Sequence, residues 1–129
     1  MKELKFRAWD GKKMIEGVIP VSETDIVELF EYEHQVTEVE AVEQYTGLKD
    51  KNGQKIYEGD IVTFLVERFN NVTLGFESED WHTAVVEWNQ DDACYSFMVR
   101  DVPFSVRYEA EVIGNIHENQ ELLEIKNEI

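Results

Sequence analysis

The chain has 129 residues, 43% of them hydrophobic and 12% aromatic, which suits one folded domain and excludes a disordered chain. Its 28 acidic and 12 basic residues give a formal net charge of −16, so the surface repels phosphate and we expect no direct binding of nucleic acid. No apolar run approaches the roughly 20 residues that cross a bilayer. The charged N-terminus lacks the apolar segment of a secretion signal, so we expect a cytoplasmic protein that does not contact membranes.

Two N-terminal strands joined by a tight turn open the predicted fold. Residues 4–9 alternate with a two-residue period, which is typical of a strand. Asp10 and Gly11 favour a hairpin turn because an Asp-Gly pair tolerates the positive φ that such turns need. Residues 14–18 then form the return strand.

Aromatic side chains at patterned positions are candidates for an interface. Trp9 shares the polar side of the first strand with Lys5 and Arg7, so another part of the fold covers it or a partner does. We expect both basic residues to lie near an acidic surface, within the chain or across a subunit contact. Tyr45 and Tyr57 complete this candidate interface.

The acidic third of the chain is less clearly patterned. Five of the twelve bases lie in the first 13 residues, whereas residues 14–48 contain nine acids and no Lys or Arg. Within this third, the sequence does not decide whether residues 22–33 form a helix or a strand. Ser22 is a candidate helix cap, with Asp25 three residues further on. We expect one domain over residues 1–129, with a subdomain break around 17–43 as one alternative. The acids form either a solvated surface or a face for a basic partner.

The remaining segments predict a mostly-β protein. Strand patterns cover residues 36–45, 60–69, 82–89, 94–100 and 110–116, with a loop over 68–81 and a short helix over 118–125 capped by Asn119. Pro20 and Pro103 indicate turns or edge strands. Many short strands with glycine corners indicate a small SH3-like barrel or half-barrel with hairpin extensions and one or two short helices.

The stretch "QYTGLKDKNGQKIYEGDIVTF" could be a binding loop or a structural corner. A calcium loop is excluded, because its first and twelfth positions would be Leu48 and Gly59 instead of acids. A phosphate-binding loop is excluded because no Gly-Lys-Ser/Thr follows a strand. We therefore predict a structural corner. The predicted turn residues along the chain are Gly11, Gly47, Asn52, Gly53, Gly59 and Gly114.

At these residues the chain resembles a known family. "KFRAWD", then "QYTGLKDKNGQKIYEGDIV", then "VIGNIHENQELL" are similar, in this order, to signature segments of the YopX protein family. That family occurs in bacteriophages and prophages, and its biochemical role is unknown. The resemblance implies a mostly-β phage protein with an SH3-like barrel that forms homo-oligomers, and it brings no catalytic residues. Residues 17–43 and 68–81 match no pattern of the family, so partner specificity could lie there.

No constellation of residues indicates an enzyme. The three histidines, His34, His82 and His117, have no second ligand at metal spacing. The acids Glu77, Glu79, Asp80, Asp91 and Asp92 could pair as in a glycosidase or a nuclease, but close pairs are expected by chance among 28 acids. Acidic neighbours disfavour a reactive thiol at Cys94, which we predict to be a buried core residue. We predict no catalytic, cofactor-binding or metal-binding residues.

Two classes of function remain from the sequence. The first is a non-enzymatic phage accessory protein that assembles with itself or binds a host or phage protein. The second is an acidic DNA mimic, whose carboxylates would occupy a nucleic-acid-binding protein. The mimic requires regularly spaced rows of acids on one face, for which residues 23–43 are the candidate stretch.

Overall fold

The chain forms β-structure almost throughout the residues that the structure describes, which are 5–21, 24–29 and 35–124. The structure is a computed structural model. It divides into two compact units, residues 1–48 and 49–129. The sequence suggested a break around 17–43, whereas this division follows Leu48, near the end of strand β6 (Ala41–Lys49).

The first unit is built on strand β1 (Phe6–Trp9), which pairs antiparallel with β2 (Met14–Glu16) on one side and with β6 on the other. The predicted hairpin between β1 and β2 is confirmed. Gly11 has a φ of 101°, and the carboxylate of Asp10 accepts hydrogen bonds from the N–H groups of Lys12 and Lys13, both at 2.8 Å. These bonds stabilise the turn and lower the pKa of Asp10.

A three-stranded sheet completes the first unit. Its strands are β3 (Val18–Pro20), β4 (Ile26–Leu29) and β5 (Val36–Glu38), in the order β3-β4-β5. The alternative of a helix is therefore wrong for the residues of β4, where β-branched side chains suit a strand that is paired on both edges. The candidate cap Ser22 lies outside the described residues. The core of this unit consists of Ala8, Val18, Val27 and Val39.

The second unit is a curled half-barrel, as predicted. After the short β7 (Lys55–Tyr57), five antiparallel strands form one sheet in the order β11-β10-β9-β8-β12. Their bounds are β8 (Asp60–Phe69), β9 (Phe76–Asn89), β10 (Cys94–Val99), β11 (Val102–Ser105) and β12 (Ala110–Asn115). Phe64 and Phe97 are fully buried at the centre of the core, with their ring centroids 5.3 Å apart. Both rings belong to the hydrophobic core of this unit.

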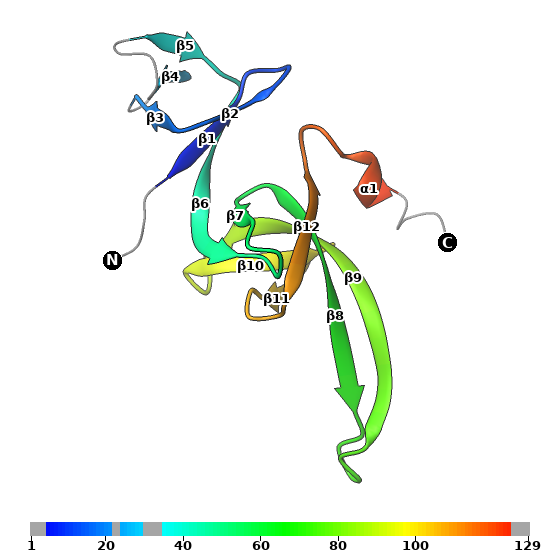
Figure 1. Cartoon of the computed structure of the whole chain (residues 1–129). Helices are drawn as coiled ribbons and strands as arrows, with labels where there is room; N and C mark the ends of the chain where they lie inside the picture. The colour runs from blue at the N-terminus through cyan, green and yellow to red at the C-terminus, as the bar shows by residue number, and fades with distance from the viewer. Residues whose placement is uncertain (1–4, 22–23, 30–34, 125–129) are drawn as a thin grey trace. The chain divides into compact units, whose positions relative to one another are not determined.

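The hairpin of β8 and β9 is longer than the sequence predicted. The segment expected to be a loop, residues 68–81, is mostly strand, because Phe69 pairs with Phe76 and only residues 70–75 connect the two strands. Strand β12 pairs only with residues 60–64 of β8, and strand β10 pairs only with residues 85–89 of β9. The outer halves of β8 and β9 therefore pair only with each other, and Figure 1 shows them continuing together beyond the other strands of this unit.

Two further elements test sequence predictions. Pro103 lies in β11 and Pro20 in β3, and both are edge strands, as predicted for prolines within β-structure.

Helix α1 (Glu121–Glu124) confirms the short C-terminal helix, but Asn119 does not cap it by its side chain. The Oδ1 atom of Asn119 instead accepts a hydrogen bond from the N–H of Asn115 at 3.2 Å. In the described ranges, no helix has the length and apolar composition that a membrane span requires.

Candidate functional site

The glycine-rich stretch is organised by a carboxylate that the sequence analysis did not single out. Asp50 is 8% exposed, and its Oδ1 atom accepts hydrogen bonds from the N–H groups of Asn52 and Gln54, both at 2.9 Å. Its Oδ2 atom accepts one from the N–H of Val112 at 3.0 Å. Gly53 closes the turn with a φ of 82°. The signal was present in the sequence, since an Asp two residues before Asn-Gly favours an Asx turn.

The charge of Asp50 is stabilised where it lies. Burial raises the pKa of its carboxyl group, but the three donated backbone hydrogen bonds outweigh this effect, and its pKa lies below the ordinary value of 3.8. The ionised group ties the turn to strand β12, 62 residues further along the chain. This part of the stretch is thus built as a structural corner.

Gly59 forms the second turn and connects two strands. It is buried, with a φ of 87° that side chains other than glycine rarely adopt. Its N–H donates to the carbonyl of Val86 at 2.8 Å, and its carbonyl accepts from the N–H of Ile116 at 3.0 Å. The neighbouring Asp60, 2% exposed, accepts a hydrogen bond from the N–H of Tyr57 at 2.8 Å.

Two of the predicted turn glycines lie inside strands. Gly47 lies in β6 with a φ of 90°, where the missing Cβ permits a local bend in the strand. Gly114 lies in β12 next to a register shift, and a Cβ at this position would come within 2.5 Å of the Oδ1 atom of Asn119. Glycine is needed there for close packing and not for a turn.

The candidate interface residues lie largely inside the protein. Arg7 is 6% exposed, and its Nε atom donates to Glu43 Oε1 at 2.9 Å in a buried ion pair. The acidic surface expected near Arg7 is therefore provided by its own chain. Tyr45 and Tyr57 are 3% and 5% exposed, while Lys5 and Trp9 are half-buried. Burial removes the tyrosines and Arg7 from the residues that can contact a partner in this conformation.

Exposed apolar side chains concentrate instead on the outer part of the β8–β9 hairpin, which we call the arm (residues 67–81). Val72 and Leu74 at its tip are 90% and 79% exposed. Behind them, Phe69 and Phe76 are 51% and 60% exposed and contact each other edge to face, with ring centroids 6.1 Å apart. Trp81, at the base of the arm, is 61% exposed.

The strand register gathers these aromatic side chains on one face of the arm. Phe69 and Phe76 are opposite each other, and Glu67 is opposite Glu79 in the next pair on the same face. Trp81 follows two residues after Glu79, again on that face. Like charges that face each other across two strands repel, so this face has two glutamates between aromatic side chains. Arg68 lies on the other face, where it forms an exposed ion pair with Asp80 at 3.4 Å.

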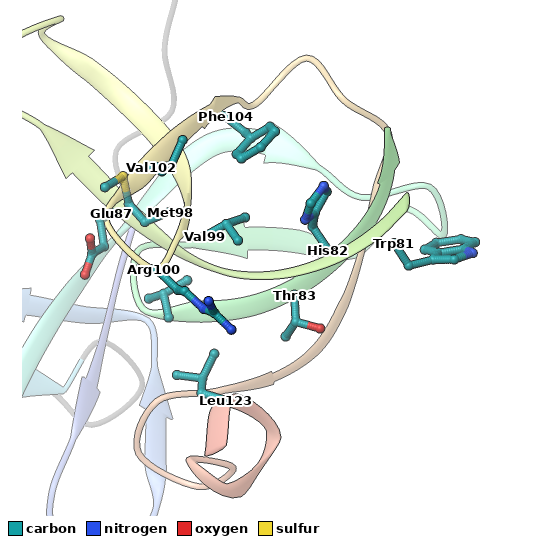
Figure 2. Close-up of a pocket in the computed structure, with 11 residues that line it drawn as sticks. Trp81, His82, Thr83, Glu87, Met98, Val99, Arg100, Val102, Phe104 and Leu123 are labelled. Carbon is teal, nitrogen blue, oxygen red and sulfur yellow. The ribbon is translucent and has the colours of Figure 1, made fainter. Parts of the chain in front are cut away.

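A groove lies on the sheet of the same unit, between β9, β10, β11 and α1. Its volume is about 640 Å³. Figure 2 shows Arg100 among mostly apolar side chains and Trp81 pointing away from the others. The ring of His82 packs against Phe104 with centroids 5.0 Å apart. Strand β11 was not predicted from the sequence, so neither was this groove.

The histidine, cysteine and carboxylate side chains considered as catalytic or metal-binding candidates are not brought together in one site among the described residues. Among residues 5–21, 24–29 and 35–124, no group of three or more His, Cys, Asp or Glu side chains could hold a metal ion. The carboxylates singled out from the sequence lie on the arm or in the β9–β10 turn, and His34 lies outside the described residues. Cys94 is exposed, so its predicted burial is wrong; it begins β10 at the turn, where no core reaches it.

The sequence matches the family model of the YopX protein over residues 5–124. The chain belongs to the YopX protein family. The match includes both compact units. It confirms the resemblance found in the signature segments, and it assigns no biochemical function.

A solved structure has a similar fold. The crystal structure of protein EF1440 from Enterococcus faecalis is similar with a TM-score of 0.61 and 27% sequence identity, over 95% of this chain and 99% of that chain. The likeness therefore extends over nearly the whole length of both proteins. No curated protein matches the sequence of this YopX family member.

The acidic stretch proposed as a DNA mimic is only partly described. Glu28 on β4 and Glu38 on β5 share one face with Ile26 and Val36, because the register pairs Ile26 with Glu38 and Glu28 with Val36. Glu43 is buried in its ion pair with arginine. In the portion of the stretch that can be described, acids thus alternate with apolar side chains on that face. The mimic stays a prediction from composition.

Proposed function

We propose that the protein is a non-enzymatic phage or prophage accessory module that acts by binding another protein or further copies of itself through the arm. The observation that carries this proposal is the exposure of Val72 and Leu74, 90% and 79%, at the end of a hairpin that no other described strand covers. Apolar side chains gathered on a projecting element are typical of contact surfaces. Aromatic side chains behind the tip are typical anchors of such contacts.

The arm face also favours a basic partner. Glu67 and Glu79 are opposite each other between the Phe69–Phe76 pair and Trp81. A Lys or Arg side chain placed between the two glutamates would relieve their repulsion and lie beside aromatic rings, which also attract cations. At a net charge of −16, a homo-oligomer would have to bring a basic segment of a second copy to this face.

Sedimentation velocity of the purified chain tests self-assembly first. The variant V72N/L74N removes the apolar tip, and Asn accepts the positive φ of 61° that Leu74 adopts. V36N is the matched control, because Val36 is 60% exposed but lies on β5 of the first unit. We expect the parent and V36N to form the same oligomer, and V72N/L74N to sediment as a smaller species.

Affinity capture from lysate of phage-infected cells tests the other form of the proposal. If the parent is a monomer, we expect one or more proteins to be retained by the parent and V36N but lost with V72N/L74N, and to elute as salt rises. The proposal is wrong if all three chains sediment alike and also retain the same proteins.

A further inference from the structure

The corner at residues 50–54 contains the one Asn-Gly pair of the sequence, Asn52 and Gly53. At such a pair the backbone attacks the asparagine side chain most readily, because glycine has no Cβ to shield its nitrogen or to restrict the rotation that the attack needs. Both residues are exposed, so water reaches them. Apart from the chain neighbours, no heavy atom lies within 4 Å of the position that a Cβ on Gly53 would occupy, so neighbouring side chains leave room for a ring.

The reaction open to this pair is deamidation through a cyclic imide. The backbone nitrogen of Gly53 loses its proton to hydroxide and attacks the Cγ atom of Asn52. A bond between this nitrogen and Cγ forms, the bond between Cγ and Nδ2 breaks, and the amide nitrogen takes up a proton from water and leaves as ammonia. Water then opens the imide ring at either of its carbonyl groups, which leaves an aspartate or an isoaspartate at position 52. The balance closes with water consumed and ammonia released.

The closed corner withholds both reacting groups. The N–H of Gly53, whose nitrogen must attack, donates to the carbonyl of Asp50 at 3.0 Å. The Nδ2 atom of Asn52, which must leave, donates to Glu111 Oε1 at 3.4 Å. The backbone N–H of Asn52 is held as well, by Asp50 Oδ1 at 2.9 Å. The attack therefore requires that the corner first opens locally.

Strand β12 helps to keep the corner closed. The Oδ2 atom of Asp50 accepts a hydrogen bond from the N–H of Val112 at 3.0 Å. The N–H of Lys51 donates to the carbonyl of Ala110, also at 3.0 Å. These two bonds join the turn to a strand about 60 residues further along the chain. The reactivity of the Asn-Gly pair should therefore rise when the corner separates from β12.

Neither product can rebuild the same corner. In the aspartate product, a carboxylate replaces the amide that donated to Glu111, so that two like charges face each other. In the isoaspartate product, the chain runs through the side chain of residue 52 and is lengthened by an additional carbon atom. The bond from the N–H of Gly53 to the carbonyl of Asp50 depends on the native spacing. The change is permanent, because the ammonia has left the protein.

We propose that Asn52 is a site of spontaneous deamidation, which the corner prevents while it is closed and permits when it opens. An opening of the corner, which is reversible in itself, is thereby converted into a permanent change of the chain. The fraction of modified molecules records how long the corner has been open. This site lies outside the arm and does not depend on the function proposed for the arm.

Peptide mapping by mass spectrometry tests the proposal on the full chain, incubated at neutral pH with and without urea. In urea we expect Asn52 to be the site that deamidates fastest, giving separable aspartate and isoaspartate peptides. Asn70 is the internal control, because it is also exposed but is followed by Asn71 instead of glycine. In the folded chain we expect Asn52 to react at least about tenfold more slowly than in urea, which corresponds to an opening free energy of about 1.4 kcal/mol.

Hydrogen exchange of the Gly53 amide measures the opening directly, because exchange and deamidation both begin with loss of the same proton. The factor by which folding slows exchange of this amide should equal the factor by which it slows deamidation. D50N removes the bond to Val112, so we expect both reactions to be faster in folded D50N than in the parent. D101N is the matched control, because it makes the same change of charge at an exposed turn residue, and it should react like the parent.

Several outcomes would overturn the proposal. It is wrong if Asn52 and Asn70 react alike in urea, or if folding does not slow the reaction of Asn52. It is also wrong if D50N exchanges its Gly53 amide faster than D101N but deamidates at the same rate. If D50N does not fold, the parent at urea concentrations below its unfolding transition gives the same comparison of the two rates. Finally, the change is not permanent in its effect if the purified isoaspartate form exchanges the Gly53 amide as slowly as the parent, and the proposal then fails.

Discussion

The carboxylate of Asp50 provides the sharpest test of how this fold is held together. In D50N the side chain keeps one acceptor oxygen for the turn but presents an NH₂ group toward the N–H of Val112, which lies 3.0 Å from Oδ2 in the parent. Two donors then face each other at a position that is 8% exposed. The N–H of Val112 therefore loses its acceptor in D50N.

The size of the effect follows from this one bond. A hydrogen bond to a charged group contributes about 1.5–3 kcal/mol, and we expect D50N to lower the free energy of unfolding by about that amount at pH 7. The control D101N makes the same change of charge at an exposed turn residue and should have an effect below about 0.5 kcal/mol. Urea unfolding followed by circular dichroism and by tryptophan fluorescence measures both variants.

The stability difference between the parent and D50N should decrease at low pH. The pKa of Asp50 is lowered in the folded protein, so its contribution to stability is fully present above its ordinary pKa of 3.8 and is lost as the pH falls through the lower folded pKa. The difference between the parent and D50N should therefore be constant from pH 7 to about 5 and shrink below about 4. The reasoning is refuted if D50N unfolds like D101N, or if the difference persists unchanged at pH 3.

Three further perturbations test other parts of the structure. G59V should lower the free energy of unfolding by roughly 1–3 kcal/mol in urea, because Val is strained at a φ of 87°; unchanged stability would contradict the role of this turn. R7M removes the arginine of the buried Arg7–Glu43 ion pair and should cost about 3–5 kcal/mol, whereas the double variant R7M/E43L should recover most of this loss. Equal stability of the single and double variants would exclude that account. Cys94, being exposed, should react with a thiol reagent in the native protein at one equivalent per chain, and protection until unfolding would show that it is buried.

Local turn chemistry made much of the fold predictable from the sequence. The Asp10-Gly11 and Asn52-Gly53 pairs specify turns through residues adjacent in the chain, and both turns are present. The strand over 60–69 has an apolar pattern that burial enforces, and its bounds match those of β8. These features depend on neighbours within a few residues, which a single sequence contains.

The features that were predicted wrongly or missed depend on contacts between distant residues, or lie where no core imposes an apolar pattern. The sequence "FESED", which begins β9, is exposed on nearly every residue, so no apolar alternation marks it as a strand. Cys94 was assigned to the core from residue type, but its place at the start of β10 leaves it exposed. The burial of Arg7 depends on Glu43, 36 residues away. Likewise, the groove exists only because β11 folds beside β10.

The contact between Asp50 and Val112 has a consequence for the order in which the second unit forms during synthesis. Strand β8 needs β12 along one edge over 60–64, and the corner at Asp50 needs the same strand for its third hydrogen bond. Strand β12 is synthesised only after about 50 to 60 further residues have been added to the growing chain. Until then the hairpin of β8 and β9 can pair internally, but one edge of β8 is open to other strands. The half-barrel therefore closes late in translation, and the nascent chain passes through a stage that is vulnerable to mispairing.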